Sequence, residues 1–241
     1  MIKKNYPLLI STTFLLMFLT SCDFLKNCTK GSGEIIEKQL VISAFEQIEL
    51  LGEYSVFLSQ GKEQKITVKA QSNLVNLINT SVSRKRWEIK FNPCVETKEA
   101  IEIYIQVPDL TSISVKGSGK IIGDSIFNTN KLKLNIEGSG SIKMEVETKE
   151  LSSKIDGSGD LNLSGKTKKH QIEVNGSGDV NAFELSSAEA EIEIKGSGDV
   201  KVDVSYALDA SVNGSGDIYY KGSVKKINSS VDGSGRLNQA N

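Results

Sequence analysis

The sequence predicts an all-β protein, a parallel β-helix (β-solenoid) in which coils of about 19 residues stack on one another. Three regularities indicate this fold class: a repeated Gly-Ser-Gly triplet, a fixed apolar phase around it, and a polar residue on either side of it. The triplet recurs at spacings of 18 to 21 residues, a period typical of repeat architectures. Its copies begin at Gly117, Gly138, Gly157, Gly176, Gly196, Gly214 and Gly233.

The residues that flank each triplet alternate between polar and apolar. A β-branched residue stands two positions before every triplet, and Ile, Leu or Val stands two positions after it, as Val115 and Ile121 do in the first copy. The residues that touch the triplet are polar, as Lys116 and Lys120 are. Because a period of two is typical of strands, each repeat is predicted to form two short strands around a glycine corner, with the apolar side chains inward.

Neither of these strands could bury its apolar face alone, whereas stacked repeats would bury it in a continuous column. The glycines would let the backbone adopt positive φ at each corner. The alternative is an antiparallel meander or sandwich in which each triplet is a three-residue hairpin loop. The same residue class at the same phase of every copy favours the parallel stack.

Four segments are expected along the chain: a lipoprotein signal peptide (1–21), a lipidated tether (22–34), an N-terminal β region of irregular first coils (35–115) and the repeat solenoid (116–241). Within the N-terminal region, residues 45–60 and 101–107 alternate like strands, and Pro108 ends the second of these. Residues 73–78 have helical spacing for one turn at most. The isolated triplet that begins at Gly31 is expected to start a first coil.

The first residues have the pattern of an export signal, with Lys3 and Lys4 before an apolar run over residues 7–19. The run ends in Leu19-Thr20-Ser21-Cys22, which resembles the bacterial lipobox. Cys22 is therefore the expected lipidation site, and several acyl chains such as palmitate would anchor it stably in a membrane. A plain signal peptide or an uncleaved anchor helix is the alternative, although the run is short for a bilayer span.

The remaining cysteines, Cys28 and Cys94, are expected to pair, because an exported chain folds in an oxidising compartment. Two buried free thiols are the alternative. The predicted location is the cell envelope, at the outer membrane or the cell surface, although Asp23 after the lipidated cysteine retains lipoproteins in the inner membrane of some lineages.

The composition excludes a strongly charged binding protein. The 29 Lys and Arg residues nearly balance the 30 Asp and Glu residues, so no global field attracts nucleic acid. The basic run Arg84-Lys85-Arg86 before Trp87 could contact phosphate or glycan, but a solvated turn leading to a core-facing Trp87 is the favoured interpretation.

Catalytic and metal-binding patterns are weak. The single histidine, His170, lies in the apolar phase of its repeat and is expected to be structural, and no nucleophile elbow surrounds the serines. A column of carboxylates at the same phase could take calcium, but Lys195, solvent and local turn hydrogen bonds are expected to relieve the repulsion instead. The column contains Asp160, Asp179, Asp199 and Asp217. We therefore expect no catalytic residue, no metal and no cofactor.

Several motifs together resemble the putative auto-transporter adhesin, head GIN domain family. They are Val-Asn-Gly-Ser-Gly-Asp-Val at 174–180, Phe-Glu-Gln-Ile-Glu-Leu at 45–50, Val-Phe-Leu-Ser-Gln-Gly at 56–61 and the lipobox. The resemblance implies a right-handed parallel β-helix related in shape to pectin lyases, without their catalytic residues, and a role in surface adhesion.

The function expected from these observations is that of a non-enzymatic, lipid-anchored envelope protein that presents a β-solenoid for adhesion or for contact with a glycan or protein. A polysaccharide-active enzyme on a β-helix and a periplasmic structural or stress module are the alternatives. The expected partners are a membrane through Cys22, a glycan or surface protein, and a second copy of the chain, but not nucleic acid.

Overall fold

The computed structural model describes residues 28–240, and every regular element in this range is a β-strand. The first half holds nine short strands. They are β1 (Thr29–Lys30), β2 (Ile35–Leu40), β3 (Gln47–Leu51), β4 (Ser55–Gln60), β5 (Lys65–Gln71), β6 (Val82–Ser83), β7 (Arg86–Ile89), β8 (Val95–Glu96) and β9 (Glu102–Val107).

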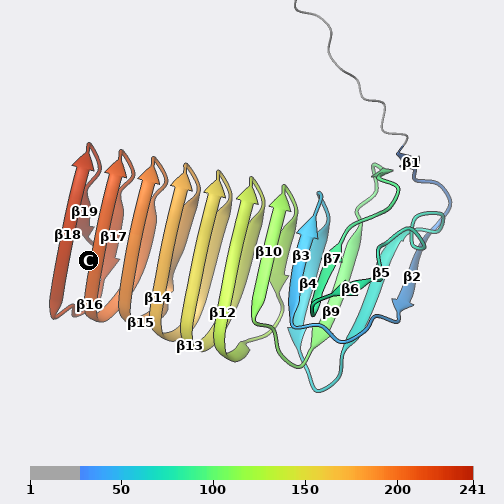
Figure 1. The fold of residues 1–241 in the computed structure, drawn as a ribbon, viewed down its shortest axis with the longest axis horizontal. Helices are drawn as coiled ribbons and strands as arrows, with labels where there is room; N and C mark the ends of the chain where they lie inside the picture. The colour runs from blue at the N-terminus through green and yellow to red at the C-terminus, as the bar shows by residue number, and fades with distance from the viewer. Residues whose placement is uncertain (1–27, 241) are drawn as a thin grey trace, which may run out of the picture.

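The second half holds the repeats, and its central strands are long because they continue around one corner of the coil. They are β10 (Ser112–Gly117), β11 (Lys120–Gly123), β12 (Phe127–Gly138), β13 (Ser141–Gly157), β14 (Asp160–Gly176), β15 (Asp179–Gly196), β16 (Val200–Gly214), β17 (Ile218–Lys221), β18 (Lys226–Gly233) and β19 (Leu237–Gln239). In Figure 1 these coils follow one another along the long axis of the molecule.

The repeats pair in parallel and in phase, which confirms the predicted β-solenoid of about 7 turns. Val115 lies beside Ile136, Ile136 beside Ile155, and Ile155 beside Val174. The first glycines of successive triplets are partners in the same way, as Gly157 and Gly176 are. The antiparallel alternative was wrong for the repeats: among the strands described, antiparallel pairing joins only β2 to β5, β5 to β9 and β6 to β7.

Each triplet forms a corner in which the first glycine is required for its backbone conformation and, from the second copy on, also for space, whereas the third is required for space alone. The first glycine has positive φ in all seven copies, for example +131° at Gly176. At the third glycine the constraint is space, because a Cβ on Gly178 would lie 2.5 Å from the carbonyl oxygen of Gly159 in the preceding coil. The serine between them links its corner to that of the preceding coil, since the Ser177 N–H donates to the Gly157 carbonyl oxygen at 2.9 Å. The corner therefore depends on backbone contacts that only glycine permits.

Uneven repeat spacing is absorbed away from the corners. Between Asn162 and Ser164 the register of β14 against β15 shifts by one residue, which accommodates the 20-residue spacing between Gly176 and Gly196. Further shifts between β15 and β16 follow in the next coil, whose spacing is 18 residues. Bulges of this kind let a strand carry an extra residue and then resume its alternation, so the apolar phase is regained before the next triplet.

The N-terminal coils do not stack in chain order. β3 pairs in parallel with β7 on one side and β10 on the other, and β4 lies likewise between β9 and β11. The coil at 86–107 is therefore outside the coil at 47–60, and the chain crosses back over the latter to begin the repeats. Strand β10 runs through the expected boundary between residues 115 and 116.

The isolated triplet at Gly31 does not start a coil, contrary to expectation. β1 instead pairs in parallel with β8, and β2 pairs antiparallel with β5 as part of a cap over the end of the stack. The corner that precedes the first repeat is formed by Gly52, which has φ +131° and lies under Gly117. Residues 72–76 form turns, in agreement with the expected limit of one helical turn in this segment.

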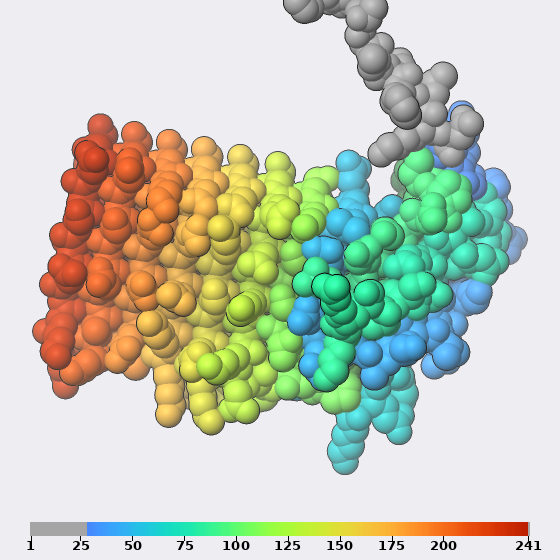
Figure 2. Space-filling view, viewed as in Figure 1, coloured from blue at the N-terminus to red at the C-terminus, as the bar shows by residue number. Residues whose placement is uncertain are grey.

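A single apolar column fills the coils from end to end. Trp87, Ile103, Ile136 and Ile194 are among its fully buried members. The side chains that alternate with them lie on the surface, and Figure 2 shows the coils as successive layers with the last repeats at one end and the capped region at the other. Because the interior is filled, binding groups must be sought on the outer faces.

Candidate functional site

A hairpin turn carries the basic run of the N-terminal region. Arg84 and Lys85 form the two-residue loop between β6 and β7, with Ser83 opposite Arg86, and both loop residues have positive φ, 49° and 61°. This is the backbone of a tight hairpin turn in which Asn and Gly are the usual residues, so two long basic residues here carry a conformational cost. Such local strain is concentrated at functional sites, which makes the turn a candidate.

Contacts to β3 hold the turn in place. The Glu46 N–H and the Gln47 N–H both donate to the Lys85 carbonyl oxygen, and the Lys85 Nζ lies 2.6 Å from Glu46 Oε1. Trp87 is fully buried and its Nε1–H donates to the Asn79 carbonyl oxygen at 2.8 Å. The expected core-facing Trp87 is thus confirmed, and it fixes the strand from which Arg86 projects.

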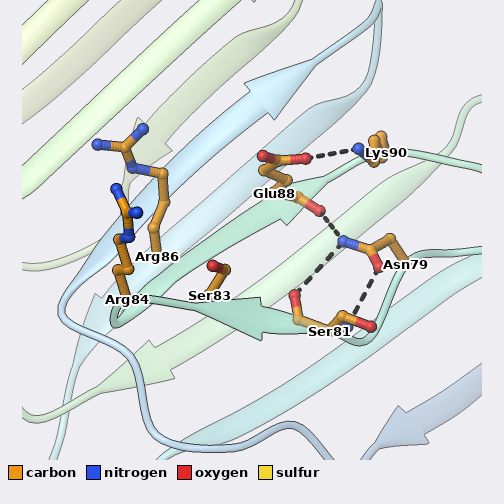
Figure 3. Close-up of a pocket in the computed structure, with 7 residues that line it drawn as sticks. All are labelled: Asn79, Ser81, Ser83, Arg84, Arg86, Glu88 and Lys90. Carbon is orange, nitrogen blue, oxygen red and sulfur yellow. Dashed lines mark hydrogen bonds and ion pairs between the residues drawn. The ribbon is translucent and has the colours of Figure 1, made fainter.

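Beside the turn lies a hollow of about 420 Å³ on the outer surface. Figure 3 shows Arg84 and Arg86 next to each other at one end, with Asn79, Glu88 and Lys90 at the other. Ser83 lies between these ends, and Ser81 lies beside Asn79. The full lining is Asn79, Ser81, Ser83, Arg84, Arg86, Glu88 and Lys90. We call this set the arginine pocket.

The charges in the arginine pocket are unevenly compensated. Lys90 lies 2.5 Å from Glu88, and this hydrogen bond, followed by the charge of Lys90, lowers the pKa of the Glu88 carboxyl below its usual value. Arg86 Nε donates to the amide oxygen of Gln47 at 3.2 Å, and within residues 28–240 neither Arg84 nor Arg86 forms an ion pair. Two guanidinium groups therefore face solvent in the same hollow, an arrangement suited to an anion.

The predicted aspartate column forms, but as a hydrogen-bonded ladder. Asp179 Oδ1 accepts the Asp199 N–H at 2.8 Å, and Asp199 Oδ1 accepts the Asp217 N–H at the same distance. These bonds join successive coils and are not the local turn hydrogen bonds that were expected, although they do supply the carboxylates with donors. Lys195 does not take part, because it pairs with Glu193 at 2.6 Å. In the part of the chain that the structure describes, no group of three His, Cys, Asp or Glu residues is placed to hold a metal ion.

His170 is a core residue. Its side chain is 1% exposed, and its Nε2 lies 2.9 Å from the Ser153 hydroxyl oxygen. Burial lowers the pKa of His170 to about 3, so the ring is neutral at physiological pH. The expected structural role agrees with this position, since the histidine is remote from solvent and from the arginine pocket.

The cysteines fall into two groups. Cys28 and Cys94 are joined by a disulfide in the structure, with their Cα atoms 4.6 Å apart, and the bond lies beside the pairing of β1 with β8. Cys22, the expected lipidation site, lies outside the described residues, as does the signal segment. Between residues 28 and 240 the structure contains no helix that could span a membrane.

Two features of the site escaped prediction from sequence. One is the positive φ of Arg84 and Lys85, for which neither residue type gives a signal. The other is the contribution of Asn79 and Ser81, which precede the turn in sequence and reach the pocket through a loop. Asn79 Nδ2 donates to the Glu88 carbonyl oxygen at 2.8 Å, a contact that no local pattern reveals.

These features define a class of protein: a β-solenoid whose glycines build the coil and whose exposed polar groups lie on its outer faces. Comparison identifies the family. Residues 44–224 match the putative auto-transporter adhesin, head GIN domain family, and the chain therefore belongs to it. No curated protein matches the chain.

Solved structures from Bacteroides and Parabacteroides species share the fold. A putative adhesin from Bacteroides fragilis has a TM-score of 0.81 at 23% identity, and one from Parabacteroides merdae has 0.74 at 21%. A putative lipid binding protein from Parabacteroides distasonis has 0.73 at 25%. Each match covers 88% of this chain and 99% of the other. The family and the fold fit an adhesin-like protein of the cell surface or envelope.

Proposed function

We propose that this chain is a lipid-anchored envelope protein that binds an acidic glycan in the arginine pocket and has no enzymatic activity. The observation that carries the proposal is the pair of guanidinium groups, Arg84 and Arg86, in one open hollow without an ion-pair partner among residues 28–240. A guanidinium matches the two oxygens of a carboxylate or sulfate with parallel hydrogen bonds. Acidic sugars carry these groups.

The rest of the arginine pocket suits a sugar. The serine hydroxyls supply neutral donors and acceptors, which is what ring hydroxyls require, whereas the Asn79 amide fixes the far end of the pocket by donating to the Glu88 carbonyl oxygen. The Glu88–Lys90 pair closes the far end and leaves no excess negative charge to repel an acidic ligand. The lining is polar, so an anionic group or a sugar fits it better than an acyl chain does.

Anchoring rests on the lipobox that ends in Cys22. Metabolic labelling with an alkyne fatty acid should tag the full chain in its native host, and Cys22→Ser should abolish the label and release the protein from the membrane fraction. Label retained by the variant would contradict lipidation at this residue. Protease treatment of intact cells should cut the repeat region if the solenoid faces outward.

Ligand binding is tested with the exported chain carrying Cys22→Ser, which removes the lipid. On an array of acidic and neutral glycans we expect binding to acidic members, and Arg84→Gln or Arg86→Gln should weaken it about tenfold or more, the size of a lost charged hydrogen bond. Lys85→Gln is the matched control, because it removes one charge from the same turn but Lys85 is held by Glu46 outside the pocket.

Two results would contradict the proposal. One is an equal loss of binding in Lys85→Gln and Arg86→Gln, which would indicate a diffuse charge effect rather than a site. The other is the appearance of new reducing ends or unsaturated sugars during incubation with a bound glycan, which would show turnover and favour an enzyme.

A further inference from the structure

The apolar column is covered at one end of the solenoid and exposed at the other. At the N-terminal end the apolar column is closed by the cap, and Trp87 and Ile89 in the outermost coil are fully buried. At the other end the column lies open. Ile227 and Val231 on β18 are 47% and 43% exposed, although they continue an inward-facing column whose previous members, Leu208 and Val212, are 2% exposed.

The backbone of the last coil is open as well. Among the strands described, β18 pairs only with β16, and β19 pairs only with β17. Figure 1 shows β18 as the outermost strand, at the opposite end of the molecule from β1. Since N–H and C=O groups alternate sides along a strand, every second residue of β18 directs both groups to the open edge, and such an edge is a template for another strand.

The sequence of β18 is complementary to itself when reversed. From residue 226 to 232 it reads Lys-Ile-Asn-Ser-Ser-Val-Asp. A two-fold axis through Ser229 would therefore set Lys226 opposite Asp232, Ile227 opposite Val231, and Asn228 opposite Ser230 of a second strand. Every position would meet a partner of matching character: cation with anion, apolar with apolar, and polar with polar.

The alternation of the sheet is kept in this arrangement. Residues directly opposite in an antiparallel pair project to the same face. Ile227 and Val231 face the interior of the coil, so their pairing would close the apolar column of both copies. Lys226 and Asp232 face outward, and neither forms an ion pair within residues 28–240. The Lys226 Nζ lies instead 5.4 Å from the ring centre of Tyr206, at the rim of the edge.

We propose that the open end of the solenoid binds a second copy of this chain, by antiparallel pairing of β18 with β18 of the partner about a two-fold axis at Ser229. The contact is isologous, so it closes on a dimer and does not propagate. The dimer is an elongated rod with the capped ends farthest apart. The pairing is independent of the arginine pocket, which lies in the N-terminal coils, so either proposal can fail alone.

Charge reversal tests the register. In the exported chain with Cys22→Ser, sedimentation should show a dimer. Lys226→Asp places one aspartate opposite Asp232 at each end of the strand pair, and Asp232→Lys places one lysine opposite Lys226 at each end, so each variant should raise the dissociation constant at least tenfold. The double variant Lys226→Asp/Asp232→Lys should restore the dimer, and an equimolar mixture of the two single variants should form a heterodimer.

The same measurements can overturn the proposal. A wild-type chain that remains monomeric at high concentration would refute it, as would slow hydrogen exchange of β18 in a monomer, since that would mean the chain itself covers the edge. Single variants that dimerise like the wild type would place the interface elsewhere. Circular dichroism of each variant should show an unchanged fold, because both side chains are exposed.

Discussion

Alanine substitution of the corner glycines separates the two constraints that the structure assigns to them. Gly117 has φ +112°, but an added Cβ would lie 3.6 Å from its nearest neighbour, an ordinary contact. Gly176 has φ +131°, and an added Cβ would lie 2.3 Å from the Gly157 carbonyl oxygen. Gly117→Ala therefore tests backbone strain alone, whereas Gly176→Ala adds a clash with the backbone of the preceding coil.

The expected magnitudes differ enough to measure. Positive φ costs an alanine about 1–2 kcal/mol, of which the lower entropy of the unfolded chain returns about 0.4–1 kcal/mol. Overpacking a rigid contact adds about 1–3 kcal/mol. For a chain of this size we expect a fall in Tm of about 3 °C for Gly117→Ala and roughly 10 °C for Gly176→Ala.

Thermal unfolding followed by circular dichroism gives both values. Ser177→Ala is the control, because this side chain is exposed between the two glycines of the same corner and its removal should change stability by less than about 0.5 kcal/mol. Equal decreases in Tm for Gly117→Ala and Gly176→Ala would refute the reasoning, since they would mean that the backbone of the neighbouring coil can move to accommodate a Cβ without loss of stability.

Three further predictions concern other parts of the chain. Burial holds the pKa of His170 at about 3, below its usual 6.5, so between these pH values the unfolded chain binds a proton that the folded chain does not bind. The free energy of unfolding should therefore be highest above pH 6.5 and should fall below it by up to about 1.4 kcal/mol per pH unit. In urea titrations, His170→Leu with Ser153→Ala should flatten this slope between pH 7 and 5. Replacing Cys28 and Cys94 with serine should cost about 4 kcal/mol in oxidising buffer for a loop of this length, and should change nothing if the native thiols prove alkylatable without reduction. Millimolar calcium should leave the Tm unchanged in calorimetry, because the Asp179 carboxylate already accepts a backbone N–H; a rise would restore the metal hypothesis.

The repeat region was open to prediction because its signals are local and reinforced. A triplet with a β-branched residue at a fixed distance before it indicates a corner and an inward phase, and seven copies of the pattern favour like-on-like stacking, which buries them all. The structure places these residues in one column, as expected. His170 was predicted correctly by the same logic, from its apolar phase.

The N-terminal coils were not open to prediction in this way. Gly52 forms a corner without the second glycine or the serine of the triplet, and Gly31 belongs to a complete triplet that forms no coil corner. What distinguishes them is the neighbouring coil: Gly52 lies under Gly117, whereas the Gly31 segment pairs with strands of the cap. The local sequence pattern shows which residues can form a coil corner. Whether a segment forms a corner depends on the coil that it stacks against.

The sequence by itself determined the fold class, the coil period and the inward phase, because each follows from spacing along the chain, and its motifs carried the resemblance to the family. Only the tertiary structure decided that the coil at 86–107 lies outside the coil at 47–60, that Arg84 and Arg86 share a pocket with Asn79, and that β18 has one edge without a partner strand among residues 28–240. These are contacts between segments distant in sequence. The free energy of such contacts depends on which surfaces remain exposed after the coils have stacked, and the local sequence pattern does not contain this information.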